Sequence, residues 1–448
     1  MKLKAVIAAM LGAALMCAAS GCDITDLSKE DMLRPPKSIG DEEEIEKLIS
    51  DTASGGYTLK YPKSGSNRSA IVMHDLDGDG NDEAIAFFRD KDGATGVHML
   101  VMYDDDETWK VSSDFVTETT DVDCVDFSDI TGNGSQEILT GYSTFAAGVN
   151  FLSAYTYEKG KTNAIDAGQN YSSFYCGNLD NSGKNKIIAL SLFSPENEAK
   201  ATLLEYDDKR KSLSARSSVP MDSGVTGYRN AVFTDLAENT RGLVVDGALS
   251  NGELNTQVIY FNRQLNVLRN PLYKEKTVNP TQRGSAVFST DLDNDMKVEI
   301  PTVSSLPFNE ESGAFTAADQ VLWNNFSVEQ EALLPAQRTV ANYNYNYTIR
   351  IPDTWQAGSF TALLNKDGNE MRFCEWSKSG AGRQLFDVKV FKVTDWDKGK
   401  GVDNYVLINK DNRYAYAFSN SKSDSPLAMD DDEIKTAFSL LSGPAASK

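Results

Sequence analysis

Histidine is nearly absent from this sequence of 448 residues, which contains only His74 and His98. The two residues are far apart in sequence, with no H-E-x-x-H motif and no pair of cysteines beside them. Because zinc enzymes draw most of their ligands from histidine and cysteine, this scarcity argues against a catalytic zinc site. The G-x-S-x-G elbow of many serine hydrolases is also missing. The sequence therefore indicates no catalytic residue, and we expect a protein that is not an enzyme.

Cysteine is scarce as well, with five in the whole chain. Cys17 and Cys22 belong to the apolar N-terminal segment. The other three, Cys124, Cys176 and Cys374, are an odd number that offers no disulfide framework. Cys124 and Cys176 lie in apolar, strand-like runs, so we expect small buried side chains rather than redox groups.

Basic residues are outnumbered, with 44 Lys and Arg against 65 Asp and Glu and a formal net charge of −21. Nucleic acids and anionic lipid headgroups need a basic protein face, so we expect neither as a main partner. An acidic chain is suited to binding cations. Most of this charge is nevertheless expected to solvate the surface.

Long hydrophobic runs are missing except at the N-terminus. Lys2 and Lys4 precede an apolar stretch over 5–16, which is short for a membrane span, and a small-residue box then leads to Cys22. This arrangement resembles a bacterial lipoprotein signal, apart from Ala19 where leucine is usual. The resemblance implies a signal peptide over residues 1–22, lipidation of Cys22 and a place on the extracytoplasmic face of the cell membrane. An ordinary cleaved secretory signal and a single anchor helix are the alternatives.

An acidic loop recurs five times at intervals of 49 to 57 residues. Strand-like runs precede and follow each loop, and a third strand with a hairpin comes after a short linker. Each repeat therefore predicts four short antiparallel strands, the pattern of one propeller blade. The loops begin at Asp75, Asp129, Asn178, Asp235 and Asp291.

The predicted fold class is mainly β. We expect a β-propeller of about five four-stranded blades, or six, over residues 57–337, followed by a small α+β domain over residues 338–448. Residues 23–56 are expected to form a polar tether and one short helix. Tyr343, Tyr345 and Tyr347 alternate, so they should share one strand face, either as a stripe for sugar stacking or as packing between the two domains.

The C-terminal domain is expected to end in a helix. Five strand-like runs precede the segment MDDDEIKTAFSLL. Its acidic residues suit a helix N-terminus, and its apolar residues fall on one helical face. The helix should close an antiparallel sheet.

Two of the acidic loops keep a complete set of oxygen donors. Calcium takes six to eight oxygens, and the pattern D-x-D-x-D-G-x-x-(D/E) supplies side chains at positions 1, 3, 5 and 9 and a backbone carbonyl at position 7. In the first loop these are Asp75, Asp77, Asp79, Asn81 through its carbonyl, and Glu83. In the fifth loop they are Asp291, Asp293, Asp295, Lys297 through its carbonyl, and Glu299. We predict calcium at both loops; the alternative is an acidic turn that merely solvates a strand end.

The loops do not match an EF-hand, which needs flanking helices and a bidentate glutamate at position 12, where the first loop has Ala86. A loop of this type between strands, repeated at the blade period, resembles the FG-GAP or VCBS-type repeat of integrin-like β-propellers. The resemblance covers residues 57–337, is specific in the first and fifth loops, and implies structural rather than catalytic calcium.

The other three loops depart from the pattern. The second, from Asp129 to Glu137, has uncharged residues at positions 3 and 5, so it offers at most a weak third site. The third has Lys186 at position 9, and its ammonium could take over the role of the cation. The fourth keeps Asp235 but has Ala237 at position 3, and its register shortens.

A closed ring of five blades would make the first and fifth repeats neighbours. The two calcium loops would then flank the seam where the ends of the chain meet. We hypothesise that calcium is retained there because the seam lacks covalent continuity.

These observations favour a lipid-anchored binding or scaffold protein whose propeller face presents a surface to a protein or glycan. The alternative is a polysaccharide hydrolase or lyase with a carboxylate pair in the propeller channel. A purely structural envelope lipoprotein is a third interpretation, which the sequence does not distinguish from the first.

Overall fold

The computed structural model describes residues 39–91, 96–144, 148–180, 182–195, 197–309 and 315–441. The predicted signal peptide, Cys22 and most of the tether lie outside the described residues. Within these ranges, no helix combines the length and the apolar character needed to cross a membrane.

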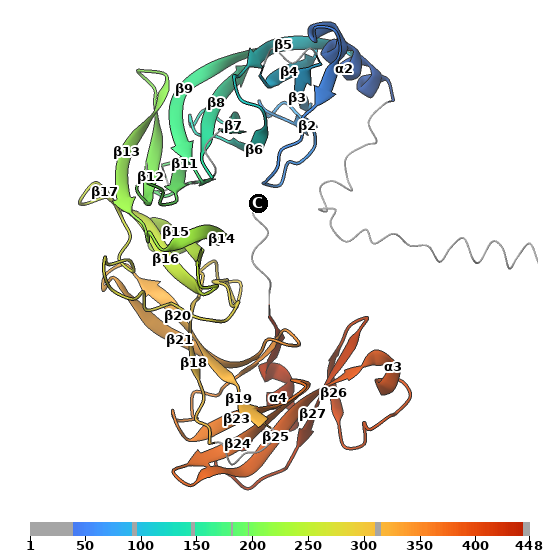
Figure 1. Ribbon diagram of the computed structural model, residues 1–448, viewed down its shortest axis with the longest axis vertical. Helices are drawn as coiled ribbons and strands as arrows, with labels where there is room; N and C mark the ends of the chain where they lie inside the picture. The colour runs from blue at the N-terminus through green and yellow to red at the C-terminus, as the bar shows by residue number, and fades with distance from the viewer. Residues whose placement is uncertain are drawn as a thin grey trace, which may run out of the picture.

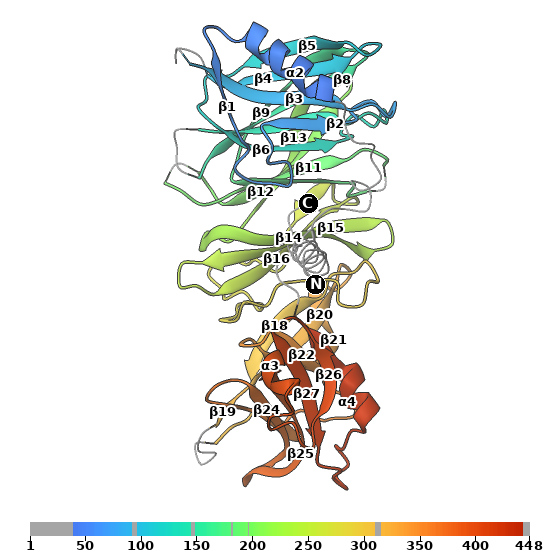
Figure 2. The same cartoon turned by 90° about the vertical axis from the view of Figure 1, so that its right-hand side faces the viewer.

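The described chain is mainly β and follows an open arc, with the C-terminal domain at its far end (Figure 1). It begins with α2 (Ile39–Thr52), the short helix expected between tether and repeats, and β1 (Tyr57–Leu59). Five repeating units come next, which we number 1 to 5 along the sequence. Figure 2 shows the same succession from the side.

Units 1 to 3 each contain the four antiparallel strands that the repeats predict, and units 2 and 3 join into one eight-stranded sheet through a single parallel pairing of β13 with β9. Unit 1 consists of β2 (Ile71–His74), β3 (Glu83–Asp90), β4 (His98–Asp104) and β5 (Trp109–Val116). Unit 2 consists of β6 (Val122–Ser128), β7 (Glu137–Ser143), β8 (Asn150–Glu158) and β9 (Lys161–Tyr171). Unit 3 consists of β10 (Ser173–Gly177), β11 (Lys186–Ser191), β12 (Lys200–Asp207) and β13 (Ser212–Pro220).

Unit 4 repeats the pattern, and unit 5 departs from it. Unit 4 consists of β14 (Val225–Ala237), β15 (Thr240–Leu249), β16 (Leu254–Asn262) and β17 (Val267–Arg269). Unit 5 contains β18 (Ile300–Ser305), β20 (Asp319–Ser327) and β21 (Ala332–Asn342), and its sheet continues through β22 (Tyr347–Arg350) to β28 (Phe438–Leu440). The predicted boundary between residues 337 and 338 therefore falls inside β21.

The strand predicted over residues 285–290 of unit 5 is wrong. This segment forms only an isolated bridge, between Thr290 and Glu299. Ser289 explains why: its backbone N–H and its hydroxyl both donate to Asp246 of unit 4, at 2.7 and 2.9 Å. Those side-chain bonds hold the segment against unit 4 and replace the ladder of a first strand.

The C-terminal domain is a six-stranded antiparallel sheet with two short helices. Its sixth strand comes from unit 5, because the short β19 pairs with β23. The strands are β19 (Phe315–Ala317), β23 (Phe360–Asn365), β24 (Glu370–Ser377), β25 (Gly380–Lys392), β26 (Val406–Lys410) and β27 (Tyr414–Asn420), and the helices are α3 (Val393–Trp396) and α4 (Asp431–Ala437).

The terminal helix begins as the sequence predicts and ends earlier. Asp430 caps α4 and forms a capping box with Glu433. The predicted apolar face extends through Leu441, but the helix ends at Ala437 because Phe438 turns into β28 and pairs with β22.

The tyrosine stripe is also wrong. Tyr343 and Tyr345 lie in the turn between β21 and β22, and Tyr347 begins β22. Tyr347 is fully buried in the core of the C-terminal domain, and Tyr343 packs against the cluster around Val287 and Trp323. Of the two alternatives, the contacts favour packing.

Each pair of consecutive units encloses its own hydrophobic cluster, as stacking of two-faced sheets requires. The outer face of unit 1 is covered by α2, whose Ile45 and Ile49 pack on Phe88 and Leu100. The outer face of unit 5 packs on Val287 and on Leu441, which follows β28. Units 1 and 5 therefore lie at opposite ends of the arc, and the seam hypothesis is wrong (Figure 1).

Candidate metal centres in the acidic loops

The first acidic loop connects β2 to β3 and is organised by its leading aspartate. Asp75 accepts the backbone N–H groups of Gly78 and Gly80, at 2.7 and 3.0 Å. Both glycines have positive φ, 78° and 96°, which suits residues without a Cβ. The sequence thus bends the chain around the Asp75 carboxylate.

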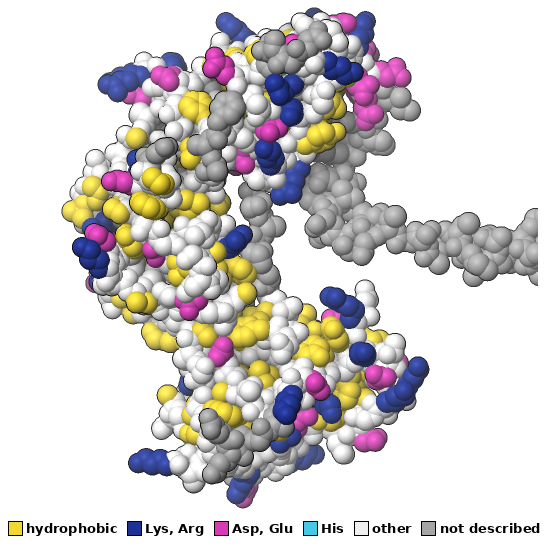
Figure 3. Space-filling view, in the orientation of Figure 1, with side chains coloured by type: hydrophobic (Ala, Val, Ile, Leu, Met, Phe, Trp, Pro, Cys, Tyr) yellow, Lys and Arg dark blue, Asp and Glu magenta, His cyan; other side chains and the backbone are white. Residues whose placement is uncertain are grey.

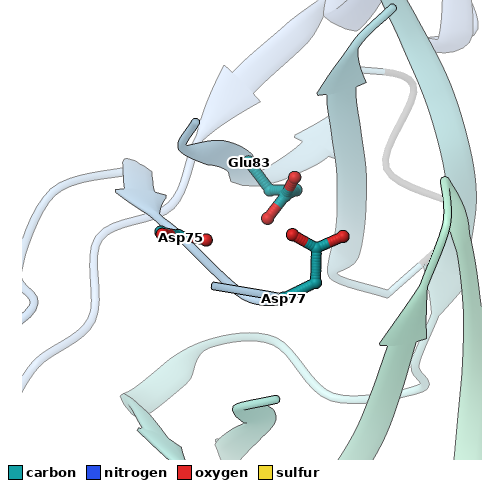
Figure 4. Close-up of side chains that lie close together, drawn as sticks. All are labelled: Asp75, Asp77 and Glu83. Atoms are coloured by element: carbon teal, nitrogen blue, oxygen red, sulfur yellow. The ribbon is translucent and has the colours of Figure 1, made fainter. Parts of the chain in front are cut away.

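Three carboxylates of this loop converge. One carboxylate oxygen from each of Asp75, Asp77 and Glu83 lies within 4.8 Å of the other two (Figure 4). Oδ1 of Asp77 is buried and has no hydrogen-bond partner among the described residues. Asp79 is outside this group, and its Oδ1 accepts the N–H of Asn81 at 2.7 Å. An orphaned carboxylate oxygen beside two further carboxylates fits the donor set that calcium prefers.

Burial and repulsion between neighbouring acids both disfavour the charged forms of Asp77 and Glu83. Burial, followed by the charge of Asp77, raises the pKa of Glu83 to about 7, although Glu83 accepts the N–H of Leu76 at 2.8 Å. Burial and the charge of Asp79 also raise the pKa of Asp77. Among the ion pairs of the described residues, none involves a carboxylate of this cluster. These shifts come first from burial and then from repulsion between the acids, and a divalent cation would favour the charged carboxylates against both.

The fifth loop gathers a different trio, because Asp291, Asp293 and Asp295 each place a carboxylate oxygen within 4.8 Å of the others. The predicted ligand Glu299 is separate from them. It is 4 % exposed, and its Oε2 accepts the N–H of Leu292 at 3.0 Å. Burial, with the charges of the three aspartates, raises the pKa of Glu299.

Asn81 and Lys297 were predicted to contribute backbone carbonyls. Their N–H groups donate to Asp79 and Asp295, at 2.7 and 2.8 Å, which orders both loops at position 7. Nζ of Lys297 also lies 3.2 Å from Oδ2 of Asp295. The carbonyl ligands themselves stay a prediction.

In the second loop, the acid at position 9 is hydrogen-bonded by residues of the loop itself. Glu137 accepts hydrogen bonds from the N–H and the hydroxyl of Thr131, both at 3.1 Å, and from the N–H of Ile130 at 2.9 Å. Within the described ranges, clusters of three possible metal ligands occur only in the first and fifth loops. The second loop is therefore a weaker candidate for a cation than the first and fifth loops.

The third loop supplies its own positive charge from a lysine side chain, as the sequence predicts. Lys186 is 3 % exposed, and its ammonium contacts the carboxylate of Asp180 directly. A second carboxylate, Glu205 from β12, lies 3.5 Å from the same nitrogen.

The fourth loop has become a tight hairpin between β14 and β15, with Asn239 in the left-handed region at φ 57°. Its leading Asp235 forms an ion pair with Nε of Arg241 at 2.9 Å. The sequence analysis recognised the shortened register but missed this pair, although a basic residue six positions after the aspartate was the available signal.

Backbone hydrogen bonds link the five loops in series, which no sequence signal revealed. The donors and acceptors are Gln136 to Leu76 at 2.7 Å, Asn185 to Asp129 at 2.9 Å, Arg241 to Leu179 at 3.4 Å, and Asp235 to Met296 at 3.3 Å. Burial and the charge of Glu83 in unit 1 also raise the pKa of Tyr157, from β8 of unit 2, so the two side chains interact across the contact between the units. A cation in the first loop would consequently stabilise the contact between units 1 and 2 as well as the loop.

The raised pKa of Glu83 predicts a pH dependence. Folding favours the neutral form of Glu83. The stability that Glu83 contributes is therefore fully present below its ordinary pKa of 4.5 and is lost as the pH rises through about 7. In chelator, this loss should reach on the order of 3 kcal/mol, because each pKa unit is worth about 1.4 kcal/mol. Urea unfolding at pH 5 and pH 8 measures it.

Other buried acids also titrate, so the comparison uses Glu83→Gln, which keeps an acceptor for the Leu76 N–H. The variant should lose less stability than wild type over this range. Equal losses in the two proteins would show that Glu83 is not held as a neutral acid.

Comparisons with known proteins give no family. No family model matches the sequence. No curated protein matches it either.

Several solved structures of low sequence identity are similar to this chain. A protein from Lactobacillus plantarum is 13 % identical, with 72 % of this chain and 86 % of that chain covered and a TM-score of 0.29. A protein from Bacteroides uniformis, named as a candidate 6-phosphogluconolactonase, is 14 % identical over 69 % of this chain and 82 % of that chain, at a TM-score of 0.30. Sqt1 from Chaetomium thermophilum is 9 % identical over 82 % of this chain and 98 % of that chain, at a TM-score of 0.31. Likenesses at this level carry no argument about the activity of this chain.

Proposed function

We propose that this chain is a lipid-anchored, extracytoplasmic binding or scaffold protein, built on a propeller-type module that calcium stabilises at the first and fifth loops. The observation that carries the proposal is the contrast between the first and third loops. The third neutralises its acids with Lys186, whereas the first brings three carboxylates together with no basic partner among the described residues. In the first loop, a bound cation would supply the positive charge that Lys186 supplies in the third loop.

Asp75, Asp77 and Glu83 would hold the first cation, and Asp291, Asp293 and Asp295 the second. Calcium would contribute positive charge and oxygen coordination, without a chemical step. Asp75 shapes the loop through its backbone contacts, and the carbonyl of Leu76 ties the loop to unit 2 by accepting the N–H of Gln136. These residues thus have structural roles, and the proposal assigns none of them to catalysis.

The proposed partner is a protein or a glycan on an exposed face of the units, and the membrane is reached through Cys22. On the face drawn in Figure 3, basic and acidic side chains are interspersed. That distribution supports a protein or glycan partner better than a nucleic acid, which calls for a continuous basic surface. Turnover of a chromogenic glycoside or a polysaccharide by the purified protein would contradict the non-catalytic role.

The proposal predicts that calcium raises the thermal unfolding midpoint of the protein. Binding to the native state alone stabilises it by about 2.7 kcal/mol at a free concentration one hundred times Kd. Asp77→Ala and Asp293→Ala should each remove part of the calcium effect, because each breaks one trio. Asp208→Ala, at an exposed acid outside the loops, is the control and should keep the whole effect.

A further inference from the structure

His98 is a buried histidine of unit 1 that lies between two carboxylates from neighbouring strands. It begins β4, its side chain is 7 % exposed, and its ring stacks on Phe88 of β3 with 4.5 Å between the ring centroids. Both carboxylate oxygens of Asp114, from β5, lie 3.0 and 3.1 Å from Nδ1 of His98. Oδ2 of Asp90, from β3, lies 3.7 Å from Nε2, and Tyr57 of β1 meets the Phe88 ring edge-on. Three strands therefore meet at this imidazole.

One nitrogen of the ring is unsatisfied. Nε2 of His98 is buried and has no hydrogen-bond partner among the described residues. An ionised carboxylate can only accept, so Nδ1 donates its hydrogen to Asp114. In a neutral imidazole, Nε2 then carries a lone pair that faces the Asp90 carboxylate with no hydrogen between them. Because buried polar atoms are normally satisfied, the geometry is that of a ring with a second proton, on Nε2.

The other charged groups around the imidazole do not supply that proton's charge. Arg89 of β3 alternates with the ring-stacking phenylalanine and so lies on the opposite face of the sheet. Lys91 is exposed, and its stem lies beside the turn that follows α2. On α2, Asp41 and Glu44 accept hydrogen bonds from Trp109 at the far end of β5, and the other charged residues of this helix are exposed. The groups that face the ring are thus the two carboxylates.

A metal ion on Nε2 is the alternative occupant. A carboxylate on the other ring nitrogen commonly supports a histidine that binds metal. Among the described residues, however, groups of three metal-ligating side chains occur only in the first and fifth loops. His98 and Asp90 would therefore supply two of the four ligands that zinc takes. A proton needs only these two groups, so the observations favour a proton.

We infer that His98 is a pH-sensitive switch that controls how firmly α2 is attached to unit 1. Asp90 also accepts the N–H of Ser54 at 3.2 Å, in the turn between α2 and β1, and the N–H of Lys91 donates to the carbonyl of Gly56 in the same turn at 3.0 Å. With the proton bound, the ring joins β3 and β5 to β4 and holds Asp90 in place beside this turn.

Histidine is the side chain that ordinarily changes charge between pH 5 and pH 8. When the proton leaves His98 as the pH rises, the lone pair of Nε2 faces the carboxylate of Asp90 again, and the turn loses support. The attachment of α2 is therefore firmer at low pH and weaker at high pH. Because α2 lies between Cys22 and the repeating units in the sequence, the switch acts on the connection to the proposed anchor. The inference does not rest on the calcium sites.

NMR of the imidazole nitrogens tests the inference directly, since the chain contains only two histidines and His74→Gln assigns both sets of signals. In calcium, we expect His98 to change between pH 5 and pH 8 from a cation with hydrogen on both nitrogens to a neutral ring with hydrogen on Nδ1. Asp90→Asn keeps an acceptor for Ser54 but removes the charge that faces Nε2, so His98 should bind its proton about tenfold less tightly. Asp104→Asn removes the same charge from an exposed position at the other end of β4 and should titrate as wild type.

Hydrogen exchange measures the attachment of α2. A proton that binds more tightly when α2 is attached must strengthen that attachment by the same factor. After correction for the intrinsic effect of pH on exchange, the amides of residues 45–56 should therefore lose up to about tenfold in protection from pH 5 to pH 8. In His98→Gln, protection of these amides should not change over this range.

Four results would overturn the inference. The first is a wild-type His98 that keeps one charge state from pH 5 to pH 8, and the second is equal titration of His98 in wild type and in Asp90→Asn. The third is a loss of protection in His98→Gln as large as that in wild type. The fourth is a shift of the His98 signals by one equivalent of zinc that abolishes the titration, which would assign the site to a metal.

Discussion

Replacing Asp246 with asparagine should destabilise the protein by roughly 3–5 kcal/mol, the usual result of breaking a buried ion pair by removing one partner. The side chains of Asp246 and Arg283 are both 0 % exposed, with Nη2 of Arg283 2.9 Å from Oδ1 of Asp246. Burial lowers the pKa of Arg283, and the carboxylate opposes that shift. With asparagine in its place, the guanidinium would remain buried and uncompensated.

The substitution also disturbs the hydrogen bonds that other residues donate to Asp246. Its carboxylate also accepts hydrogen bonds from Thr256 at 2.6 Å, from Asn230 at 2.9 Å, and twice from Ser289. These bonds connect three strands of unit 4 to the segment that leads into unit 5. Loss of the carboxylate should therefore loosen unit 5 as well as unit 4.

The free energy of unfolding in urea measures the effect, and Asp208→Asn, at an exposed ion pair, provides the matched control with a loss below about 1 kcal/mol. If Asp246→Asn does not fold, the double variant Asp246→Asn, Arg283→Met should restore folding, because it removes the unpaired charge. A single variant as stable as its control would show that the pair contributes little.

Replacing Lys186 with methionine should cost roughly 2–4 kcal/mol, because it leaves Asp180 without a cation, whereas Glu205 keeps its ion pair with Arg216. The side chain of Lys186 is 3 % exposed, and those of Asp180 and Glu205 are 15 % and 27 % exposed. Burial tends to raise the pKa of Asp180, but the hydrogen bond from Lys186 holds that pKa below its ordinary value. Methionine keeps the length of the stem but removes that effect.

Lys184→Met is the matched control for this substitution. Lys184 lies in the same loop and pairs at 2.7 Å with Asp208, which is 66 % exposed, so its loss should cost less than about 1 kcal/mol. Equal unfolding free energies for the two variants would contradict the role of Lys186 as a substitute for a bound cation.

The sequence predicted best what depends on local pattern. Alternating apolar runs on either side of each acidic loop led to the four strands of units 1 to 4, and the lysine at position 9 of the third loop led to its ion pair. The capping residues of α4 were visible for the same reason. In each case the deciding contacts lie within a few residues or one strand pairing.

What the sequence did not reveal depends on contacts between distant segments. The helical spacing of Ile45 and Ile49 predicts a short helix that packs on the body, but it does not reveal that this helix covers the outer face of unit 1 and so keeps it from packing on unit 5. Nor could the run over 285–290 show that Asp246 would hold it away from its own sheet. In the metal centres, the division of the predicted acids into trios depends on which carboxylate oxygens come together, and this becomes visible only in three dimensions.

The decisive measurement is thermal unfolding of the protein in calcium and in chelator, for wild type and for the double variant Asp77→Ala, Asp293→Ala. We expect the wild-type midpoint to rise with calcium concentration, as linkage requires, and the midpoint of the double variant to be the same in calcium and chelator. Asp208→Ala should behave as wild type. A wild-type midpoint that does not change with calcium, or a double variant that keeps the full calcium response, would contradict structural calcium in these loops.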